Sequence, residues 1–251
     1  MSKTIAIINQ KGGVGKSTTA EALAAGLSLK GYKTLSIDLD AQANLTYTSG
    51  AKTDGATALG VLTGEVKPKE AIQHTPSGDI IAANKALAGA DAFIADTGKE
   101  YKLKEALESI KADYDYIIID TPPALGILTV NALTACDSVI IPAQADIYSL
   151  QGVEQLAETM KPVKKYCNPA LSIEGILLTR YSPRSVLSRE VAELAEQLAA
   201  KLGTKLFKAT IREAIAVKEA QISQQSLYSY APKAKATEDY TAFISELLGE
   251  E

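Results

Sequence analysis

The sequence QKGGVGKST at residues 10–18 decides the fold of this 251-residue chain. It follows the apolar run IAII at residues 5–8 and precedes the helix-prone segment TAEALAA at residues 19–25, so the glycines lie where a buried strand turns into a helix. Glycines let consecutive backbone N–H groups curl around phosphate oxygens, and the positive end of the following helix dipole points at the same anion. We therefore predict a phosphate-binding loop.

The side chains of this loop have predicted roles of their own. Lys16, where the helix is expected to start, would reach the β- and γ-phosphates of a nucleotide, and the Ser17 hydroxyl would ligate Mg²⁺. The pattern G-x-x-x-x-G-K-[ST] is not met, because Gln10 stands at its first position and an additional lysine, Lys11, follows. A glycine-rich turn with a solvent-facing lysine is the alternative. The predicted nucleotide-binding residues are Lys11, Gly12, Gly13, Val14, Gly15, Lys16, Ser17 and Thr18.

Length and composition favour one soluble α/β domain over residues 1–251. Hydrophobic residues make up 46% of the chain and charged residues 22%, and no break in composition or linker divides it. No stretch of 18 apolar residues and no N-terminal apolar signal is present, so we expect a cytosolic protein. Two distant cysteines without a Cys-x-x-Cys motif favour a reduced compartment. The single histidine, His74, is interpreted as a loop residue.

Two apolar runs end in aspartates. The segment TLSI at residues 34–37 leads into DLDAQAN at 38–44, and YIII at 116–119 leads into DTPP at 120–123. Carboxylates at the carboxyl ends of parallel strands lie beside the ligand crevice, where they can hold Mg²⁺ or its waters, or orient an attacking water. Asp120 is thus predicted to hold Mg²⁺ through a water. Capping aspartates in polar turns are the alternative at both places.

Strands and helices alternate along the rest of the chain, which predicts a doubly wound, mostly parallel α/β sheet. Further strands are expected at residues 79–84, 138–142 and 173–180. Helices are expected at residues 56–62, 68–72, 99–111 and 148–166, and around an apolar stripe through Val191, Leu194, Leu198 and Leu202.

The motifs together resemble those of a known family. KGGVGKS at residues 11–17 is similar to the deviant Walker A loop of the ParA/MinD superfamily of dimerising P-loop ATPases, and 38–44 and 120–123 resemble its other signatures, with Ala41 in place of a proline. The resemblance implies that Lys11 crosses to the partner subunit's nucleotide and that Gly12 permits the close approach. It also implies that Asp40 positions or activates the hydrolytic water and serves the metal site. The adenine ring would lie near Arg180, Ile211 and Arg212.

A local excess of basic residues marks the C-terminal third. Residues 201–235 hold seven lysines or arginines against two glutamates, in a chain whose net charge is −4. Such a patch predicts contact with the phosphate backbone of DNA, without recognition of the base sequence. The alternative is a lysine-rich face that is simply exposed to solvent. The predicted DNA-binding residues are Lys205, Lys208, Lys218, Lys233 and Lys235.

The terminal segment separates the branches of the superfamily. Its apolar positions fit a helix packed on the domain, and its polar positions are acidic, which disfavours the anionic membrane surface that a MinD-type helix needs. Cys136 and Cys167 lack the surroundings of cluster ligands.

The resemblance therefore implies a ParA/Soj-like partition ATPase that uses ATP and Mg²⁺. It would form a homodimer on binding ATP, bind double-stranded DNA nonspecifically, and release it when a ParB-like centromere-binding protein stimulates hydrolysis. It would be cytoplasmic and nucleoid-associated. A membrane- or protein-positioning ATPase of the MinD type, and a biosynthetic P-loop enzyme on the same fold, are the alternatives.

Overall fold

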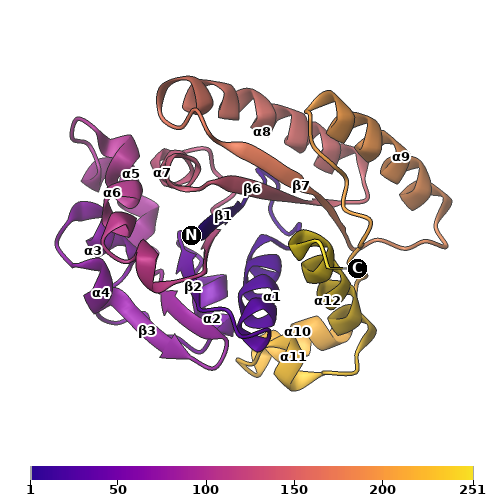
Figure 1. Cartoon of the computed structure of the whole chain (residues 1–251), viewed down its shortest axis with the longest axis horizontal. Coiled ribbons are helices and arrows are strands. Elements are labelled where there is room, and N and C mark those ends of the chain that lie inside the picture. The colour runs from indigo at the N-terminus through magenta and orange to yellow at the C-terminus, as the bar shows by residue number, and fades with distance from the viewer. Residues whose placement is uncertain (1, 251) are drawn as a thin grey trace.

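A seven-stranded sheet forms the middle of the molecule in the computed structural model, which describes residues 2–250 (Figure 1). The strand order is β3-β4-β2-β5-β1-β6-β7. Within it, β3 and β4 pair antiparallel, and the other neighbouring strands pair in parallel. The predicted doubly wound, mostly parallel α/β sheet is confirmed. The strands are β1 (Lys3–Ile7), β2 (Thr34–Asp38), β3 (Ile72–Thr75), β4 (Gly78–Ile81), β5 (Tyr116–Asp120), β6 (Ser138–Gln144) and β7 (Ser172–Thr179).

Helices cover both faces of the sheet (Figure 1). Short 3-10 turns at Lys85–Gly89, Lys99–Tyr101 and Lys111–Asp113 join some of them. The α-helices are α1 (Lys16–Leu29), α2 (Asn44–Thr48), α3 (Ala58–Thr63), α4 (Pro68–Ala71), α5 (Ala90–Phe93), α6 (Lys102–Glu108), α7 (Ile127–Ala135), α8 (Ile147–Tyr166), α9 (Val186–Lys201), α10 (Ile215–Ile222), α11 (Leu227–Tyr230) and α12 (Lys235–Leu248).

The central strands are apolar throughout because they are buried on both faces. In β5, Ile117 and Ile119 belong to the core under α3, α6, α7, α8 and α9, whereas Ile118 belongs to the opposite core. That second core lies under α1 and α12 and includes Phe207 and Phe243, whose rings meet edge to face at 4.9 Å. The expected packing of the terminal helix on the domain is thereby confirmed.

One edge of the sheet differs from the prediction. His74 was expected in a loop, but it lies in β3, which pairs with β4 in register His74 to Asp79. Its Nδ1 is 2.6 Å from the Asp79 Oδ1 atom, and the ring is exposed. A four-residue edge strand that mixes polar and apolar side chains carries too little periodicity to stand out from a loop.

Among the helices of residues 2–250, none combines the length and the apolar character needed to cross a membrane.

Candidate nucleotide-binding site

The predicted phosphate loop connects the central strand β1 to α1. Gly13 and Gly15 have φ values of +75° and +92°, a left-handed conformation that a residue with a Cβ rarely adopts. The Thr179 hydroxyl donates to the Val14 carbonyl at 2.8 Å and so ties the loop to the end of β7. Within residues 2–250 no side chain caps α1, which leaves its first N–H groups free to bind an anion.

Lys16 lies beneath the loop and is 7% exposed. Its Nζ donates to the Lys11 carbonyl at 3.3 Å. Burial lowers the pKa of this amine, while the neighbouring carboxylates of Asp120 and Asp40 raise it. A buried lysine inside a ring of free amides is suited to bind phosphate, because an anion there would compensate the charge that burial disfavours.

Three aspartates gather beside Lys16 at the carboxyl ends of β2 and β5. Asp38 and Asp120 face each other in the parallel register, and Asp40 follows two residues after Asp38. Asp38 accepts hydrogen bonds from the Thr46 N–H at 2.9 Å and the Thr46 hydroxyl at 2.7 Å. Burial raises the pKa of Asp38 to about 6 in spite of these bonds. Asp40 is 8% exposed, and its Oδ1 accepts from the backbone N–H of Gln42.

Asp120 has the environment of a metal-site carboxylate. It is fully buried, and among the described residues neither of its oxygens has a hydrogen-bond partner. Burial, and then the negative charge of Asp38, hold the pKa of Asp120 well above its ordinary value. A buried carboxyl group that lies beside a second carboxylate and lacks hydrogen-bond partners fits a hard divalent cation, which would add positive charge to that of Lys16. The residues present therefore fit Mg²⁺.

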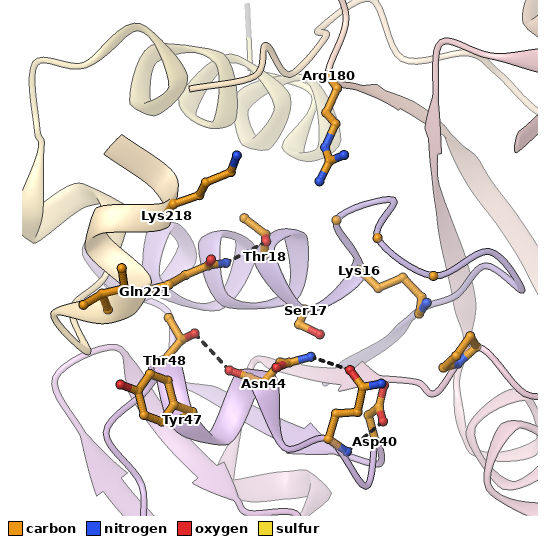
Figure 2. A pocket seen from close by; sticks show the side chains of 16 residues that line it. Lys16, Ser17, Thr18, Asp40, Asn44, Tyr47, Thr48, Arg180, Lys218 and Gln221 are labelled. Atoms are coloured by element: carbon orange, nitrogen blue, oxygen red, sulfur yellow. Dashed lines mark hydrogen bonds between the residues drawn. The ribbon is translucent and has the colours of Figure 1, made fainter. Parts of the chain in front are cut away.

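One cavity lies beside these groups (Figure 2), and a second, smaller cavity shares part of its lining. The larger one, about 480 Å³, is lined by the phosphate loop and by Asp40, and the smaller one, about 120 Å³, by Ile211 and Arg212. Arg180 lines both. The structure thus brings most of the predicted phosphate, metal and adenine residues to one place, whereas the buried Asp120 and Lys11 line neither cavity. The residues that line both cavities are Gly15, Thr18, Arg180, Lys218 and Gln221.

The two arginines predicted to lie near the adenine ring are held differently, Arg180 at a left-handed backbone position and Arg212 by an ion pair. Arg180 has a φ of +49°, which directs the chain sharply away from the end of β7. Arg212 makes a bidentate pair with Asp239 of α12, from Nε to Oδ2 at 2.6 Å and from Nη2 to Oδ1 at 2.7 Å. The charge of Arg212 is therefore paired with Asp239 at the edge of the smaller cavity.

Some residues around the larger cavity were given no role by the sequence reasoning. Gln42, Asn44 and Pro123 lie in the segments 38–44 and 120–123, which were expected beside the ligand crevice. Tyr47 and Thr48 of α2 and Gln221 and Ile222 of α10 were missed. The run at 38–44 was the one signal that could have extended the site to its neighbours.

Lys11 is turned away from the cavity. Its Nζ lies 2.7 Å from the Asp146 Oδ2 atom and 3.2 Å from the Ser149 Oγ atom, at the N-terminus of α8. Its side chain remains one-third exposed. In this structure the predicted crossing lysine is therefore bound within its own subunit.

The five predicted DNA-binding lysines do not form one cluster. Lys218 lines both cavities, Lys205 and Lys208 lie between α9 and α10, and Lys233 and Lys235 lie at the start of α12. Lys205, Lys218 and Lys235 each pair with a glutamate: Glu246, Glu213 and Glu238, respectively. Counting charges along residues 201–235 overlooked the carboxylates that α12 brings to the same surface, so the basic excess is smaller than expected.

Comparisons with known proteins agree with this geometry. A family model described as an AAA domain, AAA_31, matches residues 2–173. The sporulation initiation inhibitor protein Soj of Bacillus subtilis (strain 168) is 40% identical over 252 residues, which cover 98% of each chain. The chromosome partitioning protein ParA of Caulobacter vibrioides (strain NA1000 / CB15N) is 38% identical over 256 residues, which cover 99% of this chain and 95% of that protein.

A solved structure shares both the fold and nearly the whole length. The crystal structure of cobyrinic acid a,c-diamide synthase from Mycobacterium smegmatis with bound ADP and magnesium has a TM-score of 0.85 and 35% identity, and covers 99% of this chain and 94% of that one. With the lysine-bearing phosphate loop, the aspartates at the ends of β2 and β5, and relatives of matching length, the chain belongs to the ParA/MinD superfamily of ATPases.

Proposed function

We propose that residues 1–251 form a single ATPase domain that partitions DNA. The supporting observation is the convergence of the glycine loop, buried Lys16 and Asp40 at one cavity, with the buried Asp120 close to Lys16, in a chain that is 38% identical to a chromosome partitioning protein. ATP is the nucleotide, and the loop amides together with Lys16 bind its phosphates. The adenine ring lies near Arg180, Ile211 and Arg212.

Ser17, Asp40 and, through a water, Asp120 would hold Mg²⁺. When bound, it would offset the charge of the phosphate oxygens during transfer. Asp40 has its Oδ1 atom engaged by Gln42 and lines the cavity, which suits a group that positions a water for in-line attack. Lys16, which is already buried, adds positive charge where the transferred phosphate gathers negative charge. In this proposal Lys11, Lys16 and Asp40 are the catalytic residues.

The active form in this proposal is a homodimer that encloses two nucleotides. Lys11 reaches the partner's nucleotide after leaving Asp146 and Ser149, and the Lys11–Asp146 contact lies at a partly exposed surface. A Cβ added at Gly12 would meet no heavy atom within 4 Å, so the open side of this residue can accept a close neighbour.

DNA binds to a basic surface in the ATP-bound state, and a ParB-like centromere-binding protein stimulates hydrolysis and release. Lys233 and Lys208 make no ion pair among residues 2–250, so their charges are available to phosphates. Lys205, Lys218 and Lys235 join them by exchanging their glutamate partners, which costs little because such surface pairs are weak. The protein would thus be cytoplasmic and nucleoid-associated.

The test is binding to arbitrary duplex DNA with ATP, ADP or no nucleotide over a range of salt concentrations. We expect binding that requires ATP and weakens steeply with salt. Replacing Lys233 and Lys235 by alanine should reduce the slope of log affinity against log salt by about 2, because roughly one counterion is released per phosphate contact. Failure of the wild-type protein to bind DNA with any nucleotide contradicts the proposal.

The matched control replaces Lys161 and Lys164 of α8 by alanine. Lys161 pairs with Glu158 three residues away and is 69% exposed, much as Lys235 pairs with Glu238 and is 67% exposed. The control variant loses the same charge from a helix to which no DNA contact is assigned. If it lowers the salt slope as much as the α12 variant does, the effect is general electrostatics and not a binding face.

The biosynthetic alternative has one observation in its favour, the similarity to a structure of cobyrinic acid a,c-diamide synthase. Stimulation of ATP turnover by a small carboxylate, instead of by DNA and a partner protein, would support it. A MinD-type positioning ATPase would be recruited to liposomes of anionic lipid. The acidic residues Glu238, Asp239 and Glu246 of α12 argue against that outcome.

A further inference from the structure

One hydrogen bond joins two residues that line the nucleotide cavities and a third, smaller cavity. Gln221 of α10 donates from Nε2 to the Thr18 hydroxyl oxygen of α1 at 3.0 Å (Figure 2). Thr18 and Gln221 both line the 480 Å³ cavity, the 120 Å³ cavity and a third of about 10 Å³. This pair therefore stands between the phosphate loop and the body of α10.

α10 also packs on the domain, where Ala216 and Val217 lie partly buried against the second core, but few of its side chains are fully buried. Of its eight residues, Ala220 is buried, whereas Ile215 and Ile222 are 73% and 74% exposed. The Lys218 ammonium lies 3.4 Å from Glu213, and both side chains are more than half exposed, so this ion pair holds the helix only slightly. Within residues 2–250, the bond from Gln221 to Thr18 is the side-chain hydrogen bond that joins α10 to α1.

The same helix carries a lysine that we assign to DNA. Lys218 precedes Gln221 by three residues, which places both on one face of α10. At the other end of the hydrogen bond, Thr18 follows Ser17 directly in the phosphate-binding segment. A short physical connection thus runs from the nucleotide cavity through Thr18 and Gln221 to Lys218.

We propose that Gln221 is a positioning residue that transmits nucleotide occupancy to α10 and so places Lys218 for contact with DNA. The DNA arm of this inference rests on the proposed function. The coupling between the nucleotide cavity and α10 does not depend on it, because that part follows from the Thr18–Gln221 bond and the shared cavities.

The chemistry of the hydroxyl explains the direction of the effect. Thr18 Oγ1 accepts a hydrogen bond from Gln221 and keeps its own proton for an acceptor in the cavity. A phosphate oxygen accepting that proton makes a charge-assisted bond and polarises the hydroxyl, which strengthens the bond from Gln221 in turn. ADP and ATP both have phosphates to offer, so this device senses occupancy. In the proposed function, ATP is distinguished from ADP by the formation of the homodimer.

The test compares Gln221→Met with Gln225→Met. Methionine keeps the length of glutamine and removes the amide donor. Gln225 lies four residues further on, lines the small cavity and is exposed, so its variant is the matched control. Hydrogen exchange of the α10 amides is measured with and without ADP or a non-hydrolysable ATP analogue, alongside nucleotide affinity and the DNA affinity of the nucleotide-saturated protein.

In the wild type and in Gln225→Met, we expect nucleotide to slow exchange in α10 by about fivefold, the factor that an ordinary net hydrogen-bond contribution gives. Gln221→Met should lose this protection, change nucleotide affinity by less than about fivefold, and bind DNA about fivefold more weakly at saturating nucleotide. Equal protection in Gln221→Met and the wild type, or no nucleotide-dependent protection in the wild type, overturns the coupling.

The two proposals fail in different ways. Loss of α10 protection in Gln221→Met with unchanged DNA affinity overturns the placement of Lys218 and leaves the proposed function standing. A wild-type protein that binds no DNA refutes the proposed function and with it the DNA arm, while the exchange experiment still decides whether Gln221 couples α10 to the nucleotide.

Discussion

Glu21 is a buried carboxyl group whose ionisation should make the protein less stable as pH rises. It lies on α1, is 5% exposed, and its Oε1 accepts from the Ser77 hydroxyl at 3.3 Å. Burial raises its pKa from 4.5 to about 7, and the Ser77 hydrogen bond only partly opposes this. The neighbouring phenols of Tyr228 and Tyr240 stay neutral, since burial raises their pKa values too.

The size of the effect follows from proton linkage. Between pH 4.5 and 7 the folded state binds the Glu21 proton more tightly than the unfolded chain does, so the free energy of unfolding falls as pH rises through this window. A shift from 4.5 to about 7 corresponds to about 3 kcal/mol in total, of which roughly 2.5 kcal/mol falls between pH 5 and 8.5. Glu21→Gln removes the ionisation and should remove this loss.

The assay is urea unfolding of the nucleotide-free protein from pH 5 to 8.5, for the wild type, Glu21→Gln and Glu219→Gln. The pKa values of Asp38 and Asp120 are also raised, that of Asp38 to about 6, so the wild-type curve alone mixes several groups, and the difference between variants isolates Glu21. Glu219 is exposed on α10, and its variant should follow the wild type. A constant difference between Glu21→Gln and the wild type across this range would refute the reasoning.

Three other substitutions probe the phosphate loop and the core. Lys16→Ala removes the buried amine beneath the loop and should abolish nucleotide binding, measured with a fluorescent ADP analogue; full ATPase activity would defeat the site assignment. Phe243→Ala removes a fully buried ring that packs on Phe207 and should lower the free energy of unfolding by about 3–5 kcal/mol in urea titrations, and a loss below about 1 kcal/mol would contradict that packing. Gly175→Ala places a Cβ 2.5 Å from the Phe207 ring and 3.1 Å from the Lys205 carbonyl. The variant should be less stable by about 1–3 kcal/mol and should melt at a lower temperature than the wild type. In Gly203→Ala, by contrast, the new Cβ meets no atom within 4 Å, so any loss of stability arises from the left-handed φ alone.

Most of the features predicted correctly from the sequence depend on residues that are close together in the chain. The loop at 10–18 and the aspartates at 38–40 and 120 each combine an apolar strand with the group that it delivers, so local pattern reveals both the element and its edge of the sheet. The strand β3 was missed because four mixed residues have no clear period. Gln221 was missed because its role depends on Thr18, which is distant in sequence and joined to it only by folding.

Charge was the least predictable property of the surface. The lysines of residues 201–235 can be counted in the sequence. The carboxylates that pair with them come from α12 and from Glu213, and only the tertiary structure shows which lysine each one meets. Lys11 shows the same limit. Its motif indicates an unusual role, whereas its contact with Asp146 joins residues that are far apart in the sequence.

The central place of β1 has a consequence for how the protein is made. This strand is synthesised before its neighbours, which are β5, paired from Lys3 to Tyr116, and β6, paired from Ile5 to Ser138. At roughly 5–20 residues per second, translation reaches those partners only on the order of ten seconds later. The glycine loop must therefore wait for more than a hundred residues of nascent chain, and nucleotide can support folding only after β5 and β6 have emerged.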